Sequence, residues 1–253
     1  MKKILLVLSA IFAVLATVSF AVTGEQVMDQ MVNTNSNFKT QKTQMNMTIQ
    51  AKGQQDKNYS LVIYVYNNKT SGKKYALIRF TSPQSVKGLS FLSLGKDNEY
   101  LYMPAYHRVE RVAGSLKNSK FAGSDFTYSD LSLLYSQKES GKYTIVTENS
   151  DEYVLSILPS DSNAEYSKLM MNVVKSHMLP TKVQFYKDGK LYKTLYASSL
   201  KEVNGRWIFK NIKLEMANGS SKTFLTLAST KFNLNIPVSF FSVRTLFLPV
   251  LKY

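Results

Sequence analysis

The segment FAGSDFTYSDL, Phe121 to Leu131, gathers hydroxyl and carboxylate side chains between aromatic residues. Ser124 is its candidate nucleophile, and an esterase or lipase-like hydrolase would use this hydroxyl. Its surroundings are Gly-Ser-Asp rather than the G-x-S-x-G elbow of such hydrolases, and no motif ties His107 or His177 to it. We therefore expect a protein that is not an enzyme, with a Ser124 hydrolase as the alternative.

The same segment has a simpler structural interpretation. Thr127-Tyr128-Ser129-Asp130 matches a capping box and predicts the start of a short helix. Asp125 lies downstream of HRVERV, whose Arg108 and Arg111 are candidate bidentate partners for its carboxylate. Gly123 permits a backbone conformation that larger residues resist. We expect a lid or loop that is locked by Arg108, Arg111, Gly123, Ser124, Asp125 and Asp130.

Metal and cofactor chemistry has little support in this chain. The sequence contains two histidines and no cysteine. No carboxylate stands at a ligand spacing from either histidine, and no glycine-rich phosphate loop is present. We expect neither a metal nor a cofactor.

The amino terminus predicts export. Lys2 and Lys3 precede an apolar run, and Ser19-Phe20-Ala21 supplies the small residues of a cleavage site, so residues 1–21 are interpreted as a signal peptide. We expect residues 22–253 to form one domain that works in the periplasm. No later apolar run has the length that a membrane helix requires. Without cysteine the domain has no disulfides, and its stability must come from its core.

The net charge favours anionic partners. Lys and Arg number 32 against 17 Asp and Glu, a formal charge of +15. The lysines are scattered along the chain, which is typical of a solvated surface, and transient contact with an anionic membrane surface is the functional alternative. Export and the lack of a recognised binding motif argue against nucleic acid.

Most of the remaining chain alternates between apolar and polar residues with a period of two. In QMNMTIQ, for example, Met45, Met47 and Ile49 alternate with polar residues, as in a half-buried strand. Turn signals such as Asp188-Gly189 and Asn204-Gly205 separate these runs. The pattern predicts a mainly β protein with short helices, in which about eleven antiparallel strands curl into a barrel or half-barrel. Between Pro104 and Leu134 the strand pattern stops and a helix is expected.

Such a sheet has an inner face too wide for one layer of side chains to fill, so it requires helices or a ligand inside. The ten methionines suit apolar walls that adapt to flexible chains. Carrying an acyl chain through water in a cavity avoids exposing its methylenes, each of which costs about 0.8 kcal/mol. This physical chemistry favours a carrier that needs no catalytic residue.

The order of several blocks resembles the outer-membrane lipoprotein-sorting proteins, the LolA-like periplasmic carriers. These blocks are IRFTSPQSVKGLSFL, EYLYMPAYHRVERV, FAGSDFTYSDL, EYSKLMMNVVKSHMLPTKVQFYKDGKLYKTL and the terminal FFSVRTL. The resemblance covers nearly the whole mature chain. It implies an open, strongly curved sheet whose helical lid covers a hydrophobic cavity for acyl chains. Ala122, where many relatives carry methionine, and the high lysine content depart from the family pattern.

The expected function is that of a periplasmic, monomeric carrier that transfers lipoprotein or lipid acyl chains between membranes or to an inner-membrane lipid transporter. A non-transporting interaction module of the cell envelope is the further alternative. The side chains expected to line the cavity and lid are Met45, Met47, Ile49, Ile63, Phe91, Tyr102, Phe121, Phe126, Phe185 and Trp207.

Overall fold

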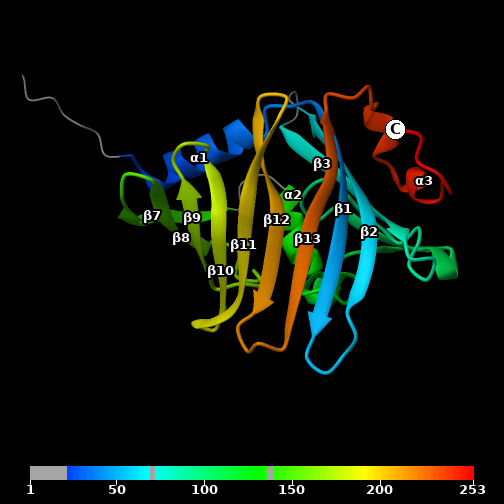
Figure 1. The fold of residues 1–253 in the computed structure, drawn as a ribbon, viewed down its shortest axis with the longest axis horizontal. Coiled ribbons are helices and arrows are strands. Elements are labelled where there is room, and N and C mark those ends of the chain that lie inside the picture. Colours follow the sequence, from blue (N-terminus) through cyan, green and yellow to red (C-terminus); the bar gives the residue numbers. More distant parts are fainter. Residues whose placement is uncertain (1–21, 69–71, 136–139) are drawn as a thin grey trace, which may run out of the picture.

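The computed structural model describes residues 22–68, 72–135 and 140–253 (Figure 1). The expected signal peptide, residues 1–21, lies outside them. The described chain forms one antiparallel sheet of 13 strands. The strands are β1 (Thr40–Ala51), β2 (Lys57–Asn68), β3 (Lys73–Ser82), β4 (Ser90–Ser93), β5 (Glu99–Met103), β6 (Arg108–Arg111), β7 (Gly141–Glu148), β8 (Glu152–Pro159), β9 (Lys168–Val174), β10 (Leu179–Lys187), β11 (Lys190–Val203), β12 (Arg206–Met216) and β13 (Ser221–Phe232).

The helices are few and short. The α-helices are α1 (Gly24–Asn35), α2 (Tyr128–Tyr135) and α3 (Val243–Leu246), and the 3-10 turns are η1 (Pro104–Tyr106), η2 (Gly114–Asn118), η3 (Phe121–Gly123) and η4 (Val238–Phe240). In the part of the chain that the structure describes, no helix is long and apolar enough to cross a membrane. The prediction of a mainly β, open, half-barrel-like sheet is confirmed, whereas the expected number of strands was too low.

The order of the strands determines where the chain between β6 and β7 must lie. The sheet runs β6-β5-β4-β3-β2-β1-β13-β12-β11-β10-β9-β8-β7. Consecutive strands are neighbours throughout, except that β6 and β7 stand at opposite edges. The chain between them therefore has to cross a face of the sheet, and η2, η3 and α2 form this crossing (Figure 1).

Strand β6 corrects the expectation that the strand pattern stops after Pro104. Arg108–Arg111 pairs with β5, with Tyr102 opposite Val109 and Tyr100 opposite Arg111. Both arginine side chains of β6 are exposed, so this short edge strand lacks the buried alternation that reveals the other strands. Charged side chains on an edge strand also discourage pairing with another molecule.

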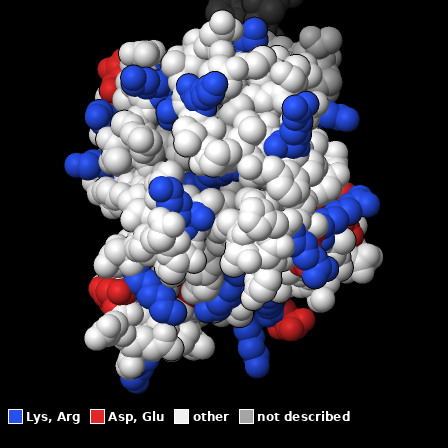
Figure 2. Space-filling model, turned by 90° about the vertical axis from the view of Figure 1, so that its right-hand side faces the viewer, with Lys and Arg blue, Asp and Glu red and all other residues white. Residues whose placement is uncertain are grey.

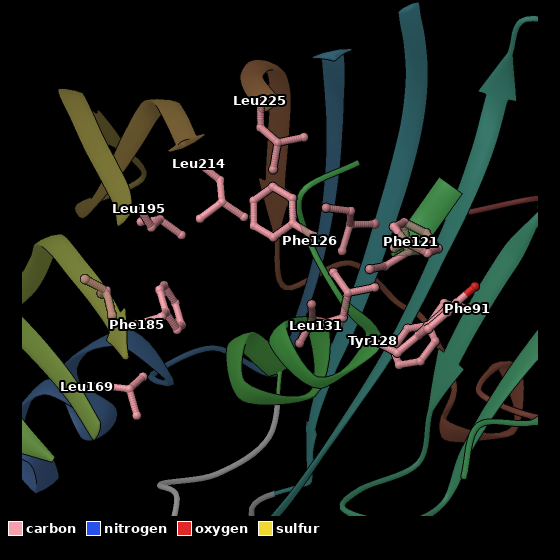
Figure 3. Close-up of a cluster of buried hydrophobic side chains, with 14 of the residues drawn as sticks. Phe91, Phe121, Phe126, Tyr128, Leu131, Leu169, Phe185, Leu195, Leu214 and Leu225 are labelled. Atoms are coloured by element: carbon pink, nitrogen blue, oxygen red, sulfur yellow. The ribbon is translucent and has the colours of Figure 1, made fainter. Parts of the chain in front are cut away.

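The inner face of the curved sheet holds the larger core. Along β1 the side chains of Met45, Met47 and Ile49 point inward, as the period of two predicts. Figure 3 shows Phe121, Phe126 and Leu131 of the crossing segment packed between strands from both halves of the sheet. The crossing segment thus fills part of the inner face, and the expected helical lid is inexact, because α2 belongs to the core.

Helix α1 packs directly against the edge strand β7. Its N-terminus has a capping box, in which Thr23 and Gln26 each accept the other's backbone N–H. A Cβ atom at Gly24 would lie 2.7 Å from the carbonyl carbon and oxygen of Tyr143. Only glycine allows this approach, which places the apolar side of α1 over the strands β7 to β10.

The outer face of β2 to β5 is covered by the carboxyl-terminal segment. Phe240, Phe241 and Leu246 pack on the outward side chains of these strands, including Tyr64 and Tyr102. Arg79 of β3 is buried there and donates to the backbone carbonyls of residues 245, 246 and 248 at 3.1, 2.8 and 2.6 Å. A cation at the carboxyl end of α3 satisfies carbonyls that the helix leaves free.

Candidate functional site

The crossing segment is buried, although it is polar. Ser124, Asp125 and Asp130 are 0, 2 and 3% exposed. A buried carboxylate is costly unless it is hydrogen-bonded or paired. The partners of these groups therefore show how the segment is held.

Asp125 is bound to strand β13. Ser221 and Thr223 donate their hydroxyls to its carboxylate, Thr223 at 2.9 Å, and Lys120 lies 3.4 Å from it. The predicted ion pair with Arg108 or Arg111 is wrong. Arg108 instead pairs with Glu110 at 2.8 Å, and Arg111 donates to the carbonyl of Asp97. The loop does not fold back on β6, because Asp125 points toward the sheet.

Asp130 confirms its predicted capping role and has a second one. The N–H of Thr127 donates to its carboxylate at 2.7 Å, and its own N–H donates to the Thr127 hydroxyl at 3.2 Å. Tyr166 donates to the same carboxylate at 2.7 Å, and the ammonium of Lys193, on β11, forms an ion pair with it. Burial and the neighbouring carboxylates raise the pKa of Tyr166, which keeps its hydroxyl protonated as a donor.

Lys193 was not predicted. Its side chain is fully buried on the inner face, where the ammonium also donates to the carbonyl of Asp125 at 3.1 Å. The rings of Tyr166 and Phe185 lie 5.3 and 5.4 Å from it. Lys193 thus fixes the crossing segment to β11 on the inner face, beside the contact that Tyr166 makes with Asp130.

Ser124 has the contacts of a structural residue. Its hydroxyl donates to the carbonyl of Phe121 at 2.7 Å and accepts from the N–H of Phe126 at 3.2 Å. His177 lies elsewhere, bonded to Ser176 and packed on Trp207, and His107 is exposed at the end of η1. The geometry does not support a nucleophile that is activated by a histidine. Nor does the described part of the chain hold a cluster of histidines and carboxylates that could bind a metal.

The predicted apolar side chains mostly share the inner face. Those in the inner core are Met45, Met47, Ile49, Ile63, Phe91, Phe121, Phe126 and Phe185. Two predicted residues lie elsewhere. Tyr102 points to the outer face, where it contacts Phe247 with ring centroids 5.1 Å apart. Trp207 is 41% exposed at the rim of the sheet.

An apolar cavity of about 350 Å³ opens between α1 and the strands β7 to β12. Its walls include Met28 and Met31 of α1 and Met171, Val183 and Leu195 of the sheet. Phe126 and Phe185 reach it among the residues predicted to line a cavity. Figure 3 shows Leu169, Phe185 and Leu195 on the far side of α2 from Phe91. The crossing segment fills one half of the inner face and leaves the other half for this cavity.

A wider opening of about 980 Å³ adjoins the cavity at the end of the sheet where α1 ends. Val32, Asn35, Ser36 and Lys74 line both spaces, so the two are adjacent. We refer to the wider space as the mouth. Its basic and aromatic side chains are Phe38, Lys73, Lys74, Lys175, His177, Arg206, Trp207 and Phe232.

Three solved structures share this architecture. A DUF1329 family protein from Desulfovibrio piger has a TM-score of 0.81 and 22% identity, over 88% of this chain and 97% of its own. An outer membrane lipoprotein-sorting protein domain from Vibrio parahaemolyticus has a TM-score of 0.79 and 24% identity, over 88% and 97%. A LolA superfamily protein from Nitrosomonas europaea has a TM-score of 0.70 and 20% identity, over 89% and 100%. The fold is therefore LolA-like, and the predicted resemblance is confirmed.

The sequence comparison gives the family. A family model described as "-like: Uncharacterized protein" matches residues 72–247, which is more than half of the chain, so the chain belongs to that family. None of the curated proteins matches this sequence.

Proposed function

We propose that this protein is a periplasmic carrier that binds the acyl chains of a lipoprotein or lipid and transfers them between membranes or to an inner-membrane transporter. The supporting observation is the apolar cavity under α1, which adjoins a wide mouth. The cavity volume of about 350 Å³ lies in the range of small-molecule binding sites. The sorting role named for the Vibrio structure is consistent with the proposal.

Burial of an acyl chain would provide the affinity. Ten methylenes moved from water into the cavity would contribute roughly 8 kcal/mol before the cost of association is subtracted. Methionines on both walls, Met28 and Met31 on α1 and Met171 on β9, allow the walls to adapt to the chain. No catalytic group is needed, which agrees with the structural contacts of Ser124.

A cavity-filling variant tests this proposal. Met171→Trp places a large side chain in the cavity, whereas Met170→Trp places it on the opposite face of the same strand. In a titration with a fluorescent fatty acid, lipid-free wild-type protein and Met170→Trp should bind, and Met171→Trp should lose most of its affinity.

Equal binding by the two tryptophan variants would place the lipid outside the cavity and contradict the proposal. Ester hydrolysis that disappears in Ser124→Ala would favour the hydrolase instead. Neither binding nor hydrolysis by the wild-type protein would favour an interaction module of the cell envelope.

A further inference from the structure

Lys74 occupies an unusual place at the junction between the mouth and the cavity. It lies on β3 in the alternation of Ala76 and Ile78, so its side chain belongs to the inner face. It lines both the polar mouth and the apolar cavity and is half-buried. Among the residues that the structure describes, its ammonium has neither a hydrogen-bond nor an ion-pair partner.

An unpaired ammonium in this position is unfavourable. Partial removal from water lowers the pKa of Lys74 below its ordinary value. The buried ammonium of Lys193 is by contrast paired with Asp130. Lys74 therefore has the surroundings of a cation that awaits an anionic partner.

The rest of the mouth shows the same excess of positive charge. Arg206 lies near the rings of Phe38 and Phe232, 5.9 and 5.3 Å from their centroids. Within the described part of the chain it forms no ion pair with a carboxylate. Lys175 is already compensated by Glu148 at 2.7 Å. The described residues that line the mouth include no aspartate or glutamate.

The positively charged mouth thus lies next to the apolar cavity. An anion held by Lys74 or Arg206 would sit at the entrance of the apolar cavity, and a chain attached to it would extend between α1 and β9. A charged hydrogen bond in such a partly desolvated place is stronger than one in open water. A free anion without an acyl chain would occupy only the mouth and leave the apolar cavity empty.

We infer that the mouth is a head-group site, and that the cargo is an amphiphile with a carboxylate or phosphate head that contacts Lys74 and Arg206 while its acyl chain fills the cavity. This inference rests on the proposed carrier function and adds to it the chemical class of the cargo. A fatty acid would supply the carboxylate, and a phospholipid or lysophospholipid would supply the phosphate.

Competition with matched ligands tests the head-group site. Laurate, dodecyl phosphate and the uncharged dodecanol share one chain length, and each is used to displace an uncharged naphthylamine dye from the protein. In the wild-type protein, laurate or dodecyl phosphate should bind at least about tenfold more tightly than dodecanol. The preferred anion identifies the source of the head group.

Lys74→Met keeps the length and apolar character of the side chain and removes its charge. It should weaken binding of the preferred anion by about tenfold and leave dodecanol binding unchanged. Lys190 is the exposed first residue of β11 and lines neither the mouth nor the cavity. Lys190→Met is therefore the matched control and should change neither affinity.

Two results would contradict these proposals. If dodecanol binds as tightly as both anions and Lys74→Met changes nothing, the head-group site is wrong while the carrier function stands. If none of the three ligands displaces the dye and none binds directly, the carrier function itself fails.

Discussion

Removal of Asp130 should be among the most damaging single changes in this protein. Its carboxylate accepts from the ammonium of Lys193, the hydroxyl of Tyr166 and the N–H of Thr127. In Asp130→Ala the Lys193 ammonium stays buried with only the carbonyl of Asp125 as an acceptor. Helix α2 also loses its capping carboxylate.

The magnitude follows from these contacts. Breaking a buried ion pair from one side costs about 3–5 kcal/mol, and loss of a cap adds about 1 kcal/mol. We expect Asp130→Ala to lower the free energy of unfolding by about 4–6 kcal/mol. Lys193→Met should cost about 3 kcal/mol, because Tyr166 and Thr127 still donate to the carboxylate. The double variant removes both charges, so its cost should fall below the sum by about 2–3 kcal/mol.

Urea denaturation followed by circular dichroism measures these free energies. Lys213→Met is the matched control. Lys213 forms a partly exposed ion pair with Glu215, and both residues lie on β12, next to the strand of Lys193. Its substitution should cost at most about 1 kcal/mol. Additive costs for Asp130→Ala and Lys193→Met, within about 0.5 kcal/mol, would refute the coupling between these residues.

Three further predictions concern the loop, the core and the surface. Asp125→Ala should cost about 3 kcal/mol in the same assay, because the hydroxyls of Ser221 and Thr223 lose their acceptor. Arg111→Ala should cost less than about 1 kcal/mol, because its contact is exposed. The reverse order of these costs would favour the ion pair between Asp125 and Arg111. Burial raises the pKa of Tyr128 to about 12, so the folded state keeps a proton that the unfolded state loses above about pH 10. The free energy of unfolding should therefore fall as the pH rises from about 10 to about 12. Thermal melts at several pH values should show a shallower fall for Tyr128→Phe. Lysine and arginine side chains are dispersed over the face in Figure 2, with few acidic ones among them, so binding to anionic vesicles should weaken as salt rises in a sedimentation assay; equal binding to neutral vesicles would contradict an electrostatic contact.

Local signals in the sequence predicted local structure well. The capping box at Thr127 involves residues three positions apart, and it forms as expected. The period of two likewise predicted most strands of the open sheet. Strand β6 was missed because neither arginine at its ends is buried, so it lacks the alternation by which a half-buried strand is recognised.

Long-range partners could not be read from the sequence. Lys193 is 63 residues from Asp130, and Thr223 is 98 residues from Asp125, so their pairing depends on the chain crossing the inner face between β6 and β7. The arginines nearest in sequence, Arg108 and Arg111, bind other groups, so the predicted ion pair with Asp125 is wrong.

The two faces of the sheet were also hard to separate. Leu101 and Tyr102 are adjacent and both buried, one inside and one under the carboxyl-terminal segment, so hydrophobicity alone does not tell them apart. One wall of the cavity is formed by Met28 and Met31 of α1, and nothing in their local sequence indicates the strands that they face.

The most direct test of the account is a nuclear Overhauser measurement between bound laurate and ¹³C-labelled methionine methyl groups. Met28, Met31 and Met171 line the cavity, whereas Met216 is buried elsewhere in the sheet. Contacts from the acyl chain to the first three methyl groups, and none to Met216, are the predicted result. A bound chain without contacts to Met28, Met31 or Met171 would contradict the claim that this cavity carries the lipid.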